Sequence, residues 1–218
     1  MKWIPGIIRN IPNIERFYTD CELAVKKFDV TFSAEIYSPE RLSSEFLEYI
    51  DKKKTKRIGV CPDMGIFQDR IRRSTVDNLI AQGARQNIVD FIVKNFEENV
   101  PQEKILAEVE KMGGNPVELR FAGPSGIYHG SYNNANRKKP EELVKFIPYI
   151  THMHGKFWEM TEDLKEYNIT YDKVIPVLVK NGYDGFICSE YEGNRDVYQA
   201  QIQLRRQHCM IRQLLAKA

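Results

Sequence analysis

The sequence lacks the cysteine pattern of disulfide-stabilised and zinc-binding domains. Its four cysteines are Cys21, Cys61, Cys188 and Cys209, and no two of them form a C-x-x-C pair. Two of them lie within apolar runs, which is typical of reduced, buried thiols and argues against a disulfide framework. We therefore expect a cytoplasmic protein.

An excess of charge and a long apolar run are also missing. Basic residues number 32 and acidic residues 30, so the basic stretch 52–57 is interpreted as a solvated helix end and loop, not as a nucleic-acid site. Residues 1–10 have neither a long apolar core nor a small-residue cleavage site, so we expect no signal peptide and no membrane span. With no repeat or low-complexity tract, 42% hydrophobic residues indicate an ordinary globular domain without a nucleic-acid or membrane partner.

Apolar patterning predicts an α/β fold in which helices and strands alternate. Strands are expected at 30–36, 58–61, 150–157 and 186–190, with a short extra strand at 117–122. Helices are expected at 13–28, 42–50, 70–112, 141–149 and 171–181, with another in the tail from 196. Residues 123–140 are rich in Gly, Pro, Asn and Ser and predict a long loop. This order indicates βαβ units in a single domain, 1–218, with an insertion and loop at 70–140.

Each of the four main strands carries a metal-ligand type of residue near its carboxyl end. These residues are Glu35, Asp63, His154 and Glu190. The carboxyl ends of parallel strands converge at one mouth of an α/β barrel, and three carboxylates gathered there repel one another unless a cation neutralises them. Two Glu, one Asp and one His suit one divalent ion, with Mn²⁺ ahead of Mg²⁺, Co²⁺ and Zn²⁺.

Four segments resemble the xylose-isomerase-like sugar isomerase/epimerase family of TIM barrels. Residues 34–39 (AEIYSP) resemble the family's Glu-Ile-His-x-Pro segment, and residues 60–67 (VCPDMGIF) its Asp-bearing strand. Residues 152–157 (HMHGKF) resemble its His-x-His strand, in which the second His binds metal, and residues 189–193 (SEYEG) its final strand. Within the family, these segments most resemble the larger subunit of C-glycoside deglycosidases.

The resemblance implies a metal-dependent enzyme that removes a proton next to the carbonyl of a sugar or keto-sugar. The reaction would be that of an isomerase or epimerase, or of a C-glycoside deglycosidase-like lyase. Glu35 and Glu190 are the candidate bases, and Lys156 is a candidate for stabilising an oxyanion or, alternatively, a salt-bridged barrel lysine. Tyr37 and His152 are candidates for binding substrate.

Two departures from the family's pattern affect the choice of reaction. The epimerases have a substrate-binding His three residues after the Asp, where this sequence has Ile66, and a His two residues after the first Glu, where it has Tyr37. Both changes argue against the ordinary ketose epimerase mechanism and leave the metal ligands intact.

The sequence is too short before Glu35 for a complete barrel. A (β/α)₈ barrel has about 250 residues and a βα unit about 30, whereas 34 residues precede Glu35. We therefore expect strands five to eight of a partial TIM barrel, completed by a partner subunit or a second copy, with truncation as another explanation.

Two other functions fit parts of the pattern. Abasic-site endonucleases share this barrel, although they use several zinc ions and more than the four histidines present here. The chain could also be a scaffold subunit without catalytic activity, a hypothesis that predicts no stoichiometric metal.

Overall fold

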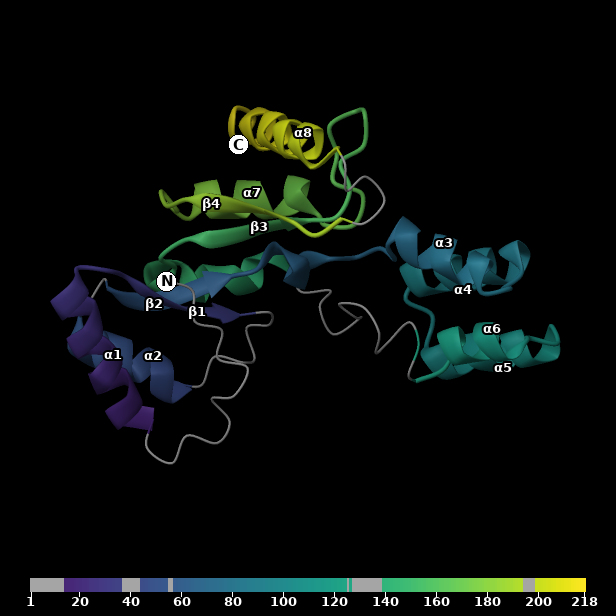
Figure 1. The fold of residues 1–218 in the computed structure, drawn as a ribbon, viewed down its shortest axis with the longest axis horizontal. Coiled ribbons are helices and arrows are strands. Elements are labelled where there is room, and N and C mark those ends of the chain that lie inside the picture. Colours follow the sequence, from purple (N-terminus) through teal and green to yellow (C-terminus); the bar gives the residue numbers. More distant parts are fainter. Residues whose placement is uncertain (1–13, 37–43, 55–56, 125, 127–138, 194–198) are drawn as a thin grey trace.

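Four short parallel strands form the centre of the described part of the chain. A computed structural model describes residues 14–36, 44–54, 57–124, 126, 139–193 and 199–218. The strands are β1 (Phe32–Ile36), β2 (Ile58–Pro62), β3 (Met153–Phe157) and β4 (Ile187–Tyr191). β1 pairs with β2 and β3 with β4, and parallel bridges from Val60 to Ile150 and from Asp63 to His154 join β2 to β3. The spatial order of the strands therefore follows the order of the sequence (Figure 1).

Helices connect the strands, as the alternating pattern predicts. α1 (Ile14–Phe28) precedes β1, α2 (Ser44–Lys53) joins β1 to β2, α7 (Tyr171–Lys180) joins β3 to β4, and α8 (Ala200–Leu215) follows β4. Between β2 and β3 lie η3 (Met64–Phe67), α3 (Arg73–Ala81), α4 (Gln86–Glu97), α5 (Gln102–Lys111), α6 (Pro116–Ala122) and η5 (Pro140–Tyr149). The structure is thus mixed α/β with parallel strands. Within the described ranges, no helix is long and apolar enough to cross a membrane.

The prediction of a short strand at 117–122 is wrong, because this segment forms helix α6. Asn115 caps the helix: its side chain accepts hydrogen bonds from the N–H groups of Val117 and Glu118, and the carboxylate of Glu118 accepts one from the N–H of Asn115. Pro116 occupies the first helical position, where its missing N–H costs nothing. The capping residues thus decide the conformation here, against the strand preference of the apolar residues.

The two central strands are completely buried, and the two outer strands are not. Every residue of β2 and β3 is buried, whereas β4 is half-buried with Cys188 exposed. α7 buries Tyr171, Val174, Ile175 and Leu178, at the spacing of one helical face, against the core around β3. Gly182 ends this helix at φ +76°, as expected from the sequence, and its N–H donates to the carbonyl of Val179.

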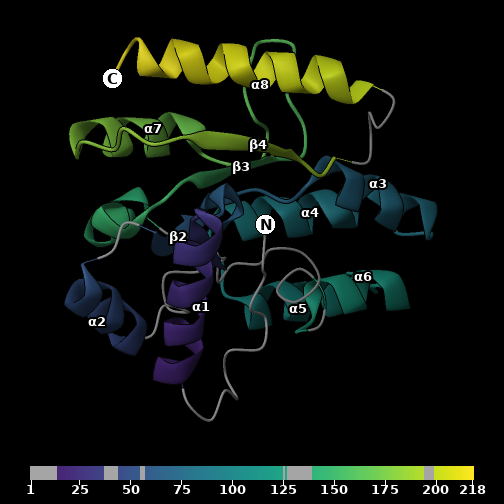
Figure 2. The same cartoon turned by 60° about the vertical axis from the view of Figure 1, so that its left-hand side comes forward.

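Helices α3 to α6 form a group with a core of their own, set apart from the strands in Figure 1; Figure 2 shows α3 and α4 lying above α5 and α6. Ile88, Ile92 and Phe96 of α4 pack with Ile105 and Val109 of α5 inside this group. Near its start, the guanidinium of Arg73 donates two hydrogen bonds, of 2.9 and 2.6 Å, to the carboxylate of Glu159 after β3. The separate core agrees with an insertion, and its boundaries at 70 and 140 remain a prediction.

The buried carboxylate of Glu118 is expected to make the stability of this helical group depend on pH. Its hydrogen bonds from Arg85, at 3.0 and 2.7 Å, outweigh its burial and lower the pKa of Glu118 from 4.5 to about 2. Because the unfolded chain binds this proton more readily, the ion pair's contribution to stability is complete above pH 4.5 and is lost as pH falls towards 2. Thermal midpoints of wild type and Glu118→Gln should differ above pH 5 and converge in acid. A constant difference across this range would contradict the prediction.

Candidate metal centre

The strand register brings the four predicted ligand residues to one end of the sheet. Glu35 lies opposite Cys61 of β2, and Asp63 follows Cys61 by two residues, directly after the strand ends. Asp63 bridges to His154, and His154 lies opposite Cys188, two residues before Glu190 on β4. Steps of two residues keep a side chain on the same face of a strand. The four side chains therefore share a face, and one ligand atom from each lies within 4.8 Å of those of the others.

His154 is at the centre of this group. Its Nδ1 lies 2.5 Å from Oε1 of Glu35 and 3.2 Å from Oε2 of Glu190. Hydrogen bonds with Cys61, Glu190 and Glu35 hold the pKa of His154 far above its usual 6.5, although burial opposes this. Burial tends to raise the pKa of Glu35, but the hydrogen bond and charge of His154 lower it overall. A metal ion bound by His154 would take the place of the proton that these hydrogen bonds favour.

Asp63 is held rigidly by the turn that follows β2. Its Oδ1 accepts a hydrogen bond of 2.7 Å from the N–H of Gly65, which caps the short helix η3. The backbone N–H of Asp63 donates to the carbonyl of Ile36, which continues the pairing with β1. Burial raises the pKa of Asp63 to about 6, against the lowering effect of Lys156. The other carboxylate oxygen, Oδ2, takes no part in this cap and lies 2.6 Å from Nζ of Lys156.

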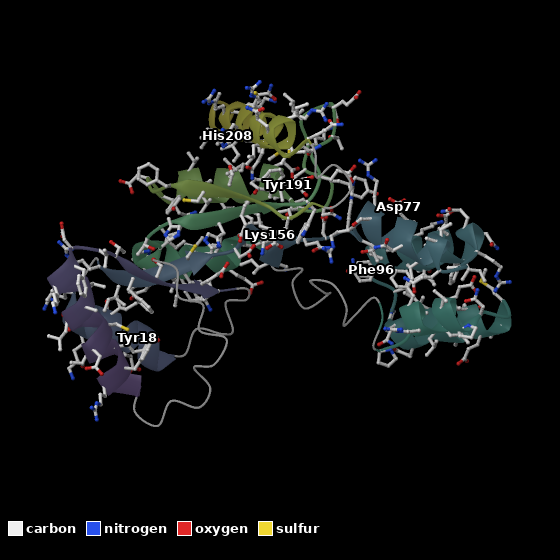
Figure 3. All side chains as sticks on the ribbon, viewed as in Figure 1. Tyr18, Asp77, Phe96, Lys156, Tyr191 and His208 are labelled. Carbon is white, nitrogen blue, oxygen red and sulfur yellow. The ribbon has the colours of Figure 1, made fainter. Side chains whose placement is uncertain are left out.

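Lys156 places a buried ammonium group among these carboxylates. Its side chain is 2% exposed, and Nζ lies 2.6 Å from Oδ2 of Asp63, 3.4 Å from Oε1 of Glu192 and 3.9 Å from Oε2 of Glu190. Figure 3 shows Lys156 amid the strands. Lys156 lies two residues after His154 and opposite Glu190 in the β3–β4 ladder, so it faces the same side as the four predicted ligands.

The residues fit a divalent metal ion. Oδ2 of Asp63 is buried, and the only positive charge that contacts it within the described residues is the ammonium of Lys156, 2.6 Å away. Three carboxylates and one imidazole are the donor set preferred by ions of the Mn²⁺, Mg²⁺ and Zn²⁺ class. With bonds of about 2.1 Å, ligand atoms on opposite sides of such an ion lie about 4.2 Å apart, and the four ligand atoms here all lie within 4.8 Å of one another. The structure thus contains a candidate metal site, whose ion the residues alone do not identify.

The other predicted site residues are distributed differently. His152 is half-buried beside the group, with Nδ1 3.2 Å from Oγ1 of Thr151 and its ring 5.6 Å from that of His154. Tyr37 lies outside the described residues. His208, which is not among the predicted site residues, is labelled on α8 in Figure 3, and its Nε2 lies 2.9 Å from Oγ of Ser189 on β4.

Sequence reasoning missed two neighbours of the candidate metal site. Cys61 places its Sγ within 4.8 Å of a ring nitrogen of His154, and Glu192 contacts Lys156. The available signal was the two-residue alternation, since Cys61 precedes Asp63 by two and Glu192 follows Glu190 by two.

Comparison with known proteins finds relatives but no matching family model. The chain is 25% identical over 185 residues to the 3'-dehydrocarminate deglycosidase alpha subunit of a Microbacterium species, covering 77% of this chain and 51% of that protein. It is 22% identical over 202 residues to a C-glycoside deglycosidase alpha subunit of Arthrobacter globiformis, covering 88% and 57%. It is 46% identical over 159 residues to a C-glycoside deglycosidase alpha subunit of Microbacterium trichothecenolyticum, covering 71% and 41%.

The chain spans about half the length of the curated relatives it matches. Their names agree with the predicted resemblance to C-glycoside deglycosidases and suggest an enzyme or an enzyme subunit. The wider xylose-isomerase-like assignment stays a prediction. The chain is similar to part of the alpha subunits of C-glycoside deglycosidases.

Proposed function

We propose that this chain carries the metal site of an enzyme that removes a proton next to the carbonyl of a keto-sugar. The observation on which this depends is the convergence of ligand atoms from Glu35, Asp63, His154 and Glu190 within 4.8 Å, at the carboxyl ends of neighbouring parallel strands. These residues would hold one divalent ion, which we propose to be Mn²⁺. When bound, such an ion polarises the substrate carbonyl and so makes the neighbouring C–H more acidic.

The exposure of the two glutamates favours Glu190 as the base. The side chain of Glu190 is 23% exposed, whereas that of Glu35 is 7% exposed and is turned towards His154. A base must come within hydrogen-bond distance of the proton it removes. We therefore assign proton removal to Glu190 and a ligand role to Glu35. Lys156 would donate to the negative oxygen that develops at the carbonyl, and it keeps the local charge balanced in the absence of substrate.

Lyase chemistry is favoured over epimerisation by the surroundings of Ile66. Its side chain is 1% exposed and packs in the core with Phe67 and Met153, so it offers no polar group to a sugar. Three of the relatives are named C-glycoside deglycosidase alpha subunits. We propose that loss of the proton from C2 of a 3-oxo-C-glycoside gives an enolate, which forms a C1=C2 double bond as the bond from C1 to the aglycone breaks. The electrons of that bond go to the aglycone carbon, which takes up a proton.

The outer edges of β1 and β4 support a partial TIM barrel. In the described part of the chain, neither edge is paired with a further strand, and Phe186, just before β4, is 79% exposed. Unpaired edges with exposed apolar residues are sites for pairing with another segment. We propose that the remaining strands come from a partner subunit, a second copy or a further segment of a longer chain.

Aglycone release is the test of the proposed function. The protein, together with any subunit that co-purifies, should release the aglycone from a 3-oxo-C-glycoside, lose this activity with a chelator and regain it with Mn²⁺. The Glu190→Gln variant should lose about 10³-fold or more in turnover, because both a ligand and a base are removed. Turnover that is unaffected by the chelator, or by Glu190→Gln, would show that the proposed centre does not perform the reaction.

A further inference from the structure

We propose that Cys61, His152 and His154 form a second metal site, for a thiophilic ion such as Zn²⁺ or Co²⁺, which shares His154 with the oxygen-rich centre. One ligand atom from each residue lies within 4.8 Å of those of the other two. Cys61 and His154 are each 2% exposed, and His152 is half-buried. This inference does not depend on the proposed enzymatic function.

An irregularity between β2 and β3 brings the three side chains together. The bridges Val60–Ile150 and Asp63–His154 are three residues apart on the β2 side and four apart on the β3 side. One extra residue on one strand is the arrangement of a β-bulge, which re-aims side chains near functional sites. Thr151 contacts both Ser33 of β1 and Nδ1 of His152, so we assign Nε2 of His152 as the ligand atom.

The chemistry of these ligands differs from that of the oxygen-rich centre. Two imidazoles and one thiolate favour borderline and soft ions, whereas carboxylates favour Mg²⁺ and Mn²⁺. In a tetrahedral zinc site, with Zn–S about 2.3 Å and Zn–N about 2.0 Å, neighbouring ligand atoms are roughly 3.5 Å apart. The ligand atoms of Cys61, His152 and His154 lie at most 4.8 Å apart in the structure, so a small movement of these side chains brings them to the separation that a bound ion requires.

Sharing of His154 couples the two sites. Where an ion held by Cys61 and His152 uses Nδ1 of His154, the nitrogen that faces Glu35 and Glu190, it takes the imidazole nitrogen of the oxygen-rich set. A thiophilic ion is thus expected to compete with Mn²⁺ for His154, although its other ligands, Cys61 and His152, do not belong to the oxygen-rich centre. Such an ion would inhibit any activity that needs Mn²⁺ in that centre.

Absorption of the Co²⁺-loaded protein tests the assignment. Binding of Co²⁺ to a thiolate produces a near-ultraviolet charge-transfer band, which carboxylates and imidazoles do not produce. We expect this band in the wild type, its loss in Cys61→Ser, and its retention in Cys188→Ser, which changes the exposed thiol opposite His154 in the β3–β4 ladder. The His152→Gln variant should bind Co²⁺ at least about tenfold more weakly, since even residues that only orient ligands contribute this much.

Two further measurements separate the sites. Cys61→Ser should still bind Mn²⁺, and Glu190→Gln should keep the cobalt–thiolate band while losing Mn²⁺. The proposal is overturned if the wild type shows no band, if the band survives in Cys61→Ser, or if Cys61→Ser loses Mn²⁺ binding as well.

Discussion

Replacing Glu190 with glutamine is expected to remove the divalent ion from the oxygen-rich centre. We expect about one Mn²⁺ per wild-type chain and almost none in Glu190→Gln at the same free concentration. The loss in affinity should exceed the factor of about 10 to 100 that is typical for residues that merely orient ligands. Elemental analysis after equilibrium dialysis, or calorimetric titration with Mn²⁺, measures this directly.

The same substitution at Glu162 serves as the matched control. Glu162 is exposed in the segment after β3, and it belongs to neither candidate set of ligands, so Glu162→Gln should retain the full metal content. If Glu190→Gln also retained it, the ion would be bound elsewhere, and the proposed centre would be wrong. If the wild type bound no stoichiometric metal, a scaffold role without catalysis would become the better interpretation.

Replacing Lys156 with methionine is expected to destabilise the metal-free protein strongly and the metal-loaded protein much less. Lys156 is buried, and its Nζ is 2.6 Å from Asp63 and 3.4 Å from Glu192. Removing one partner of a buried ion pair leaves the other charge uncompensated, which typically costs about 3–5 kcal/mol of unfolding free energy. A divalent ion supplies the missing positive charge, and ligand binding to the folded state adds stability.

Urea unfolding with and without saturating Mn²⁺ measures both effects. Lys165→Met is the control, because Lys165 forms an ion pair of similar length, 2.6 Å to Asp163, with a side chain that is 76% exposed. Such exposed pairs contribute about 0–1 kcal/mol, so the control should unfold almost as the wild type does. An equal loss of stability for Lys156→Met with and without Mn²⁺ would mean that Lys156 acts through packing and not through its charge.

The local conformation of most elements, and the face on which polar residues lie, could be predicted from the sequence. The spacing of Tyr171, Val174, Ile175 and Leu178 indicates one face of a helix, and the structure buries all four. Alternation in the segments that contain Asp63 and His154 indicates which residues share a face, because the period of a strand is two. The cap formed by Asn115 and Glu118 was also present in the sequence, although the apolar residues after it favoured a strand.

What the sequence by itself determined is which residue types stand at the ends of the strands, and hence the donor set of the candidate metal site. Only the tertiary structure decided that Asp63 and His154, 91 residues apart in the chain, are direct neighbours. It also decided that Lys156 pairs with Asp63 and that Sγ of Cys61 lies within 4.8 Å of a ring nitrogen of His154. The physical reason is that periodicity encodes the orientation of a side chain relative to its own strand. Packing between segments that are distant in the sequence decides which strands lie beside it and in which register they pair. The same packing decides that the β3 side has one more residue than the β2 side between the two bridges.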